Sequence, residues 1–292
     1  MTLNDCRQFY AEEIRFAANP KSHALIDAFA RVARESYLGA PPWRIGANPD
    51  QPDGDGKAED PRQLYHNVVV AIDPSRHLNN GQPSALATWI DALSLAPGMR
   101  VFHLGCGVGY YTAIMAEVIG GAGEVIAVEI DPGLAERAKQ NLAGYPNVTV
   151  HCADGVTFDP GVCDAMLINA GVTHPHPAWL NRLSENGRLA FPLTFGYEKI
   201  GGIGVMAKIT RKGDRFSAQI LTQVAIYNCA SARNASIEPR LREVLTSREI
   251  MKWKSVRTDP HDQNETCLLH AADICLSTAA VESQPDSTST TA

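Results

Sequence analysis

The sequence predicts an α/β fold whose central sheet is mostly parallel and ends in antiparallel strands. From Arg100 onward, near-continuous apolar segments alternate with helical segments, which is typical of a parallel sheet covered on both faces. After Phe195 the pattern alternates around a Lys-Gly-Asp turn at 212–214, which predicts an antiparallel hairpin. With 292 residues, 45% of them hydrophobic and 20% charged, the chain is not of a disordered, collagen-like or coiled-coil class.

The N-terminal part is predicted to be a helical cap. Residues 4–18 and 22–37 show helical spacing of apolar side chains. The stretch 39–61 is rich in Gly, Pro and Asp, so we expect a loop that is mobile within 48–60. Residues 1–63 therefore form a helical cap and a flexible loop in this interpretation.

The main domain is expected to span residues 64–231. It opens with an apolar run at 67–73, which predicts a strand, and continues with a helix from Ser84 to about Leu95. Further strands are predicted at 100–105, 124–130, 148–154, 164–170 and 187–193. Helices are predicted between them at 110–118, 133–143 and 178–183, and two antiparallel strands at 200–209 and 216–228.

Beyond this domain we expect a C-terminal extension over 232–280. Its apolar spacing predicts a helix at 238–250, and residues 265–277 favour a strand. Residues 281–292 are rich in Ser and Thr and predict a disordered tail.

Charge and cysteine content narrow the function classes. The 26 basic and 32 acidic residues give a net charge of −6, which argues against a broad electrostatic grip on nucleic acid or on an anionic membrane. The seven cysteines are irregularly spaced and include no C-x-x-C pair, so neither a disulfide framework nor a metal site is indicated. Without a signal sequence or a long apolar run, the expected location is cytoplasmic.

Three glycines follow the first strand of the parallel region. Gly105, Gly107 and Gly109 lie in the run HLGCGVGYYTA (103–113), at the predicted junction of a strand and a helix. Glycines at such a junction let the chain turn sharply and let a ligand lie against the main chain. Because glycines also end strands for purely structural reasons, the motif has to be read together with its neighbours.

Acidic residues at the ends of the next two strands support a cofactor that contains adenosine. Glu129 follows Gly109 by 20 residues, where its carboxylate can accept hydrogen bonds from both ribose hydroxyls. Asp154 closes the third strand, where it can accept the exocyclic amine of adenine, and Gly155 avoids crowding the ring. Three successive strands thus present such residues at the edge where open α/β sheets bind ligands.

Two features favour S-adenosylmethionine over a dinucleotide. Tyr110 stands where a dinucleotide fingerprint has its last glycine, which disfavours a pyrophosphate seat. The antiparallel strands after residue 200 suit the class I methyltransferase version of the Rossmann-like sheet, whose last strand runs against the others. The predicted cofactor is therefore S-adenosylmethionine.

The run from Arg100 to Leu193 resembles the protein-L-isoaspartate O-methyltransferase family, most specifically in GYYTAI (109–114) and NGRLAFP (186–192). The resemblance covers roughly residues 64–231. The segment AFARVARESYLG (28–39) is similar to that family's N-terminal AF-x-x-V-x-R-E segment.

The resemblance implies positions for the cofactor site. The family's contacts fall on Gly105, Gly107, Gly109, Glu129, Asp154 and Gly155. The predicted cofactor site also takes in His103, Cys106, Tyr110, Tyr111, Thr112, Ile130 and Asn169. The family's I-Y-V-P-L-T segment, whose Thr reaches the active site, matches IYNCAS and places Ser231 there.

The sequence departs from the family pattern at three places. Gly81 stands where the family has a hydroxyl residue in its substrate loop, and Asn228-Cys229 replaces the family's Val-Pro. His103 replaces the acid that usually stands two residues before the first glycine. The first two changes lie in the region that recognises the acceptor, so we expect a different peptide or small-molecule carboxylate.

The acceptor side is predicted around the loop HLNNGQPSA (77–85). Asn80 and Gln82 can hydrogen-bond an acceptor carboxylate or the methionine end of the cofactor, and ordinary turn chemistry is the alternative interpretation. A carboxylate acceptor is already ionised and needs no general base. For an alcohol or amine acceptor, His174 or His176 would be the candidate base, unless both merely face solvent.

The sequence therefore predicts an O-methyltransferase that uses S-adenosylmethionine and acts on a carboxylate. The alternatives are an NAD(P)-dependent oxidoreductase on a Rossmann fold and a cofactor-binding module without turnover. RNA methylation is disfavoured by the acidic net charge.

Overall fold

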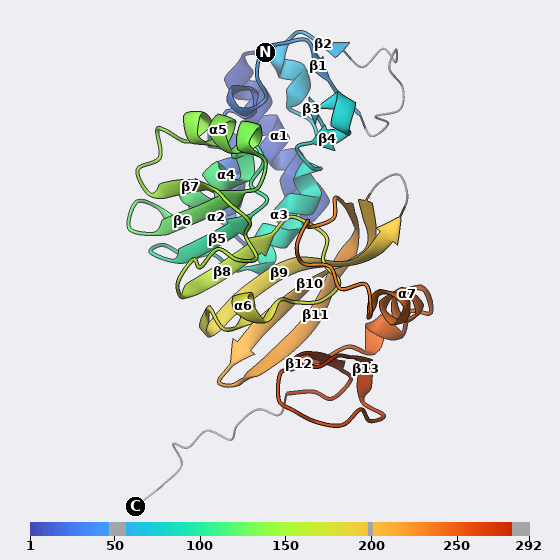
Figure 1. The fold of residues 1–292 in the computed structure, drawn as a ribbon. Helices are drawn as coiled ribbons and strands as arrows, with labels where there is room; N and C mark the ends of the chain where they lie inside the picture. Colours follow the sequence, from blue (N-terminus) through green and yellow to red (C-terminus); the bar gives the residue numbers. More distant parts are fainter. Residues whose placement is uncertain (47–56, 198–200, 282–292) are drawn as a thin grey trace, which may run out of the picture.

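The computed structural model describes residues 1–46, 57–197 and 201–281. Its main sheet contains β5 (Arg100–Leu104), β6 (Glu124–Glu129), β7 (Val148–Cys152), β8 (Cys163–Ile168), β9 (Leu183–Tyr197), β10 (Gly201–Lys212), β11 (Arg215–Ile226), β12 (Ser255–Arg257), β13 (Cys267–His270) and β14 (Cys275–Ser277). Their order in space is β13-β14-β12-β11-β10-β9-β8-β5-β6-β7 (Figure 1).

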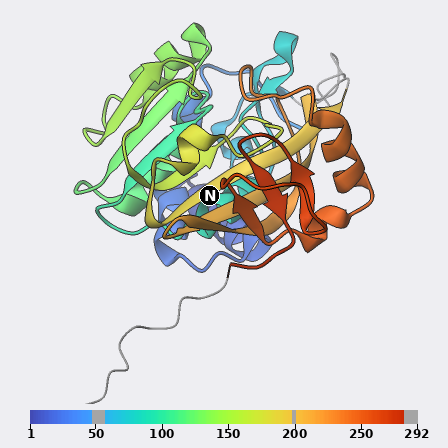
Figure 2. The ribbon, with the colours of Figure 1, turned by 60° about the horizontal axis from the view of Figure 1, so that its bottom comes forward.

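The sheet changes direction at β9. Strands β5 to β9 pair in parallel, whereas β10 pairs antiparallel with both β9 and β11, and the terminal strands continue antiparallel. This confirms the predicted Rossmann-like α/β class with antiparallel last strands. Part of the stretch expected to be a C-terminal extension adds three strands to the same sheet, which Figure 2 brings to the front in red.

Helices and short elements surround the sheet. The helices are α1 (Leu3–Ala18), α2 (His23–Arg31), α3 (Pro83–Ala92), α4 (Tyr110–Ile119), α5 (Pro132–Asn141), α6 (Pro177–Leu180) and α7 (Glu238–Thr246). Two small sheets pair β1 (Trp43–Arg44) with β2 (Lys57–Ala58) and β3 (Ala71–Asp73) with β4 (Leu78–Asn79). Single 3₁₀ turns occupy Arg34–Tyr37, Pro61–Leu64, Pro74–Arg76 and Glu249–Lys252.

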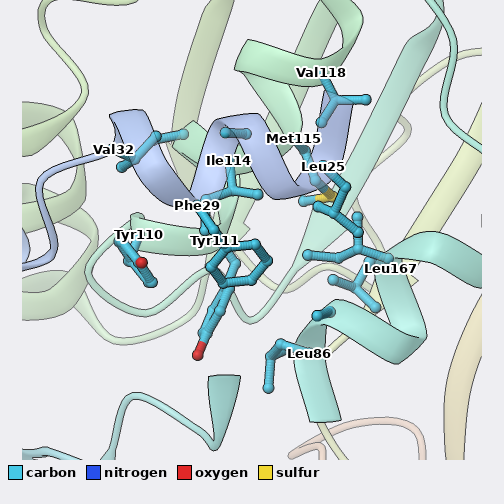
Figure 3. Close-up of a cluster of buried hydrophobic side chains, with 14 of the residues drawn as sticks. Leu25, Phe29, Val32, Leu86, Tyr110, Tyr111, Ile114, Met115, Val118 and Leu167 are labelled. Carbon is cyan, nitrogen blue, oxygen red and sulfur yellow. The ribbon is translucent and has the colours of Figure 1, made fainter. Parts of the chain in front are cut away.

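Each face of the sheet has its own core because side chains alternate along a strand. In β5, Val101 belongs to the core that α1 to α5 cover, whereas Phe102 and Leu104 belong to the opposite core. Figure 3 shows the first of these, where α2 and α4 pack their apolar side chains together. The second core is closed by α6, by α7 and by the terminal strands.

A buried guanidinium joins the N-terminal cap to the rest of the chain. Arg34 is fully buried, and its Nη1 donates to the carbonyl oxygens of Leu64 (2.6 Å) and His66 (3.1 Å). Its Nη2 donates to the carbonyl oxygen of Val68 (2.6 Å) and to Oδ1 of Asn80 (3.3 Å). This one side chain therefore shapes the segment that leads to the predicted acceptor loop.

Several predicted elements differ from the structure. Within 67–73, only Ala71–Asp73 forms a strand, because the carbonyl of Val68 is bound by Arg34 rather than by a neighbouring strand. The helix expected at 178–183 is a single turn, since β9 already begins at Leu183.

The expected strand at 265–277 is instead a hairpin, in which the N–H of Ala271 donates to the carbonyl oxygen of Ile274 (2.9 Å). The helix expected over 22–37 ends at Arg31, because Val32 is extended. Residues 47–56 of the expected flexible loop and 282–292 of the expected tail lie outside the described residues, whereas Lys57–Ala58 forms a strand.

We predict that Arg34→Lys lowers the free energy of unfolding by about 2–4 kcal/mol, because one ammonium cannot serve four buried acceptors and would leave some without a donor. Urea unfolding measures the change. Arg31→Lys is the matched control, since the Arg31 side chain is 56% exposed and pairs with Glu117 at the surface. An effect of Arg34→Lys no larger than that of the control would contradict this account.

Candidate active site

One cavity of about 1030 Å³ opens at the carboxyl ends of the parallel strands. Its lining includes the end of β5 and the glycine loop after it, the end of β6, and the first residues after β7 and β8. The opposite wall is formed by the predicted acceptor loop and by residues 223–230. Because binding clefts commonly measure about 300–1,000 Å³, the cavity can hold a cofactor together with part of an acceptor.

The glycine loop lies close to a neighbouring main chain. Gly105 and Gly107 have left-handed φ angles of +73° and +57°, and the N–H of Gly105 donates to the carbonyl oxygen of Val128 (2.8 Å). A Cβ on Gly105 would lie 3.2 Å from the carbonyl oxygen of Asn169. The loop therefore requires glycine both for its backbone conformation and for space.

The Glu129 carboxylate is fixed between this loop and the end of β6. Its Oε2 accepts from the N–H of Gly107 (2.9 Å), and its Oε1 accepts from the N–H of Asp131 (3.1 Å). The residue is only 8% exposed and lines the cavity. A carboxylate has about four acceptor sites, so lone pairs remain for ribose hydroxyls.

The third strand and the segment after β11 meet at Asp154. Its Oδ1 accepts from the N–H of Val156 (3.0 Å) and from the hydroxyl of Ser231 (2.7 Å). Gly155 leaves no room for a side chain, because a Cβ there would lie 2.5 Å from Leu104. Ser231 itself does not line the cavity, so its contact with the site runs through the Asp154 carboxylate.

Buried hydrogen bonds to Asn80 hold the predicted acceptor loop in place. Asn80 is 8% exposed, and its Oδ1 accepts from the N–H of Val70 (2.9 Å) as well as from Arg34. Its Nδ2 is buried without a hydrogen-bond partner among the described residues. Asn80 and Gln82 both line the cavity.

The position of Gly81 explains one departure from the family pattern. Its φ is +74°, and a Cβ would lie 2.8 Å from Cδ2 of Leu86. The N–H of Gly81 donates to Oδ1 of Asn79 (2.9 Å), and its carbonyl oxygen accepts from the hydroxyl of Tyr111 (3.3 Å). A hydroxyl-bearing side chain would be strained in this conformation.

Four basic side chains that the sequence patterns did not mark also border the cavity: Arg44, Lys57, Arg76 and His77. Arg76 bridges two walls, since its Nη1 lies 2.6 Å from Oδ2 of Asp131 and its carbonyl oxygen accepts from the hydroxyl of Tyr227 (3.0 Å). Their contacts depend on the tertiary fold, and no local motif marks them.

Arg44 and Lys57 stand directly opposite each other in the β1–β2 pair. Both are exposed, and neither forms an ion pair with any residue that the structure describes. Like charges placed opposite each other on neighbouring strands repel, so an anion between them would relieve the repulsion. The next residue, Ile45, bridges to Val70, which holds Asn80, so the two cations belong to the acceptor side.

Most of the predicted cofactor residues are brought together at the cavity: Gly105, Cys106, Gly107, Tyr110, Tyr111, Glu129, Ile130, Asp154, Gly155 and Asn169. Gly109 does not line it, because its backbone packs toward Leu142. The assignment of His103 and Thr112 needs correction as well. Their side chains lie in the interior, where Nδ1 of His103 and Oγ1 of Thr112 are 2.9 Å apart.

The predicted catalytic role of His174 is not supported by its position. His174 does not line the cavity, and its Nδ1 lies 3.0 Å from Oγ1 of Thr173. Burial, followed by the proximity of His176, lowers its pKa, so the imidazole is neutral at pH 7. The proline-rich segment VTHPHP follows β8, and the ring of His176, which does not line the cavity either, packs against Trp179 of α6.

Comparison with known proteins shows the family of the chain. The family model described as protein-L-isoaspartate(D-aspartate) O-methyltransferase matches residues 58–231, which is more than half of the chain. The chain belongs to this family. Family membership makes it a methyltransferase that uses S-adenosylmethionine, and it does not favour the oxidoreductase alternative.

Individual relatives agree with this placement. A protein-L-isoaspartate O-methyltransferase of Methanococcoides burtonii is 34% identical over 68% of this chain and 87% of its own length. The enzyme of Thermotoga maritima is 32% identical over 44% of this chain, and the match spans only 43% of that relative.

Solved structures show the same fold. A protein-L-isoaspartate O-methyltransferase matches with a TM-score of 0.59 at 20% identity, over 82% of this chain and 70% of its own. A Plasmodium falciparum chain assigned to the same family, in complex with S-adenosyl-L-homocysteine, matches with a TM-score of 0.59 at 18% identity over 76% of this chain and 97% of its own.

The buried histidine predicts a specific acid sensitivity. Burial lowers the pKa of His103 to about 3, against 6.5 for an exposed histidine, so protons bind preferentially to the unfolded chain between these values. Stability is therefore lost as the pH falls below about 6.5. From pH 7 to pH 5 this group alone removes about 2 kcal/mol from the free energy of unfolding.

Urea unfolding at the two pH values tests this prediction. His103→Asn, which keeps a polar group near Thr112 without titrating, is expected to lose this part of the pH dependence. His151→Asn, on β7, is the control and is expected to retain it. Equal pH dependence in all three proteins would contradict the assignment.

Proposed function

We propose that the protein transfers the methyl group of S-adenosylmethionine to a carboxylate of a peptide or small-molecule acceptor. The observation that carries this proposal is the arrangement of one cavity. Glu129, Asp154 and the glycine loop form one wall, and an amide-bearing loop together with the cations Arg44 and Lys57 forms the other.

The cofactor side of the cavity fits an adenosine group. Gly105 and Gly155 keep side chains out of the space against Asn169 and Leu104. Glu129 and Asp154 offer oxygen acceptors at the ends of successive parallel strands. S-adenosylmethionine supplies a methyl group on a sulfonium sulfur, which a carboxylate can accept without losing a proton.

The acceptor side fits an anion that needs no base. Arg44 and Lys57 provide positive charge, and Gln82 provides an amide hydrogen-bond donor at the cavity. His174 and His176, the candidate bases for an alcohol or amine acceptor, both lie outside the cavity lining. The residues of the chain then bind and orient the acceptor and exclude water, which is where catalysis of such a displacement comes from.

A finer proposal concerns the identity of the acceptor. Gly81, with its φ of +74°, leaves the substrate loop without the hydroxyl side chain that the resembled family carries there. Asn228 and Cys229, which stand in place of that family's Val-Pro, also line the cavity. We infer that the isoaspartyl group is not the preferred acceptor and that another peptide or small-molecule carboxylate takes its place.

Transfer of labelled methyl groups to a matched peptide set tests the proposal. The set holds an isoaspartyl peptide, its counterpart with normal aspartate and its counterpart with asparagine. All three have an amidated C-terminus. We expect base-labile methyl ester on a carboxylate peptide and none on the asparagine control.

The outcomes separate the two levels of the proposal. Labelling of the aspartyl peptide at least equal to that of the isoaspartyl peptide supports the different acceptor, whereas labelling of the isoaspartyl peptide alone contradicts it and retains carboxyl methylation. No labelling of either carboxylate peptide, with binding of S-adenosylhomocysteine confirmed in the same preparation, would contradict methylation of a peptide carboxylate and favour a binding module without turnover on peptides.

The cationic pair gives a prediction for the acceptor. Replacing both Arg44 and Lys57 by Gln is expected to raise KM for the carboxylate peptide about 5- to 50-fold, because two charge-assisted contacts are lost. KM for S-adenosylmethionine should change little. Arg15→Gln, an exposed residue of α1 outside the cavity, is the control. An unchanged KM for the peptide in the double variant would exclude the pair from acceptor binding.

A further inference from the structure

The terminal hairpin gathers four residues that bind metals. His261, Cys267, His270 and Cys275 each present a ligand atom, and these atoms all lie within 4.8 Å of one another. We propose that they form a structural zinc site of the Cys₂His₂ type, which staples the last three strands of the sheet.

The separations suit a tetrahedral ion after a small closure. Zinc binds thiolate sulfur at about 2.3 Å and imidazole nitrogen at about 2.0–2.1 Å, which places neighbouring ligand atoms about 3.3–3.8 Å apart. Nε2 of His261 and Sγ of Cys267 are already 3.7 Å apart. Two thiolates and two neutral imidazoles would also cancel the charge of Zn²⁺.

The two thiols donate to nearby oxygens, Cys267 to Oδ1 of Asn264 (3.6 Å) and Cys275 to the carbonyl oxygen of Leu276 (3.7 Å), and a thiolate bound to zinc would no longer make these contacts. Nδ1 of His261 lies 2.8 Å from the carbonyl oxygen of Asp259, so it carries the proton and Nε2 keeps its lone pair. Nδ1 of His270 is buried and has no hydrogen-bond partner among the described residues. The N–H of Asn264 lies 3.4 Å from Sγ of Cys267, a contact that stabilises a thiolate.

The strand register brings the four residues to one place. His270 and Cys275 are directly opposite in the β13–β14 pair. A register shift between Cys267 and Leu269 alters the alternation of that strand, so Cys267 joins the same cluster. Cys275 is almost fully buried in strand β14, which pairs with β12 on its other side.

The site is closed and separate from the cavity. Four protein ligands leave no open position for a substrate, which is typical of structural rather than catalytic zinc. None of the four residues lines the cavity, and β12 meets β11 at Phe216 and Ser217, away from the cavity-lining residues 223–226. The ion would therefore support the outer edge of the sheet.

The sequence itself does not mark a metal site here, because the chain has no C-x-x-C pair. The ligand spacing here is H-x₅-C-x₂-H-x₄-C, in which cysteine and histidine alternate. Only the hairpin turn between β13 and β14 shows that these positions meet.

Zinc content of the full-length protein tests the proposal. After equilibration with zinc and desalting, we expect about one zinc ion per chain in the wild type. The matched control Cys152→Ser, on the exposed β7 cysteine, should retain the ion. The double variant Cys267→Ser, Cys275→Ser should lose it and should melt at a lower temperature.

Cobalt substitution in the wild type keeps the test independent of whether the double variant folds. Co²⁺ bound by two thiolates in a tetrahedral site should give thiolate charge-transfer and intense d–d absorption bands, which added zinc abolishes. The proposal would be overturned if the wild type bound well under one zinc ion per chain and its cobalt form lacked these bands. Zinc retained by the double variant would also overturn it.

A disulfide between Cys267 and Cys275 is the competing arrangement. It would lower the mass of the intact chain by about 2 Da until a reductant is added, and would give two fewer reactive thiols. That result in protein prepared without oxidant would also overturn the zinc assignment.

Discussion

The hydrogen bond from the N–H of Gly107 to the Glu129 carboxylate ties the two halves of the cofactor wall together. It joins the loop after β5 to the end of β6, and the N–H of Asp131 holds the second oxygen of the same carboxylate. A side chain on Gly105 would press on Asn169, so the end of β8 is placed by the same loop. Because parallel strands end at a common edge, this local arrangement also positions Asp154 and, through it, Ser231.

The acceptor wall depends on a second buried interaction, that of Arg34. Its guanidinium binds three carbonyl oxygens and the Asn80 side chain, so the cap and the acceptor loop form one unit. The β1–β2 pair is attached to this unit, because Ile45, directly after β1, forms a β-bridge with Val70. In the proposed site, the acceptor wall therefore draws mainly on segments outside the sheet and on the end of β11, whereas the cofactor wall is built from the ends of the parallel strands. This division explains how a family's cofactor wall can persist while its acceptor loop changes at Gly81.

Sequence reasoning was most successful where function depends on local sequence. The glycine loop, Glu129 and Asp154 each follow a strand, so a periodic pattern was enough to bring them to one edge. It failed for His103, because the alternation of β5 directs that side chain into the interior. Arg44, Lys57 and the metal-binding cluster could not be predicted, since each requires knowing which distant residues a turn or a bulge brings together.

A crystal structure of the protein with S-adenosylhomocysteine and a carboxylate peptide tests the central claim most directly. The account predicts that the ribose hydroxyls bind Glu129 and that adenine lies beside Asp154 and Gly155. It also predicts that the peptide carboxylate lies between the cofactor sulfur and the wall that contains Asn80, Gln82, Arg44 and Lys57. Adenosine bound away from Glu129, or a carboxylate on the far side of the sulfur from Asn80, would contradict it.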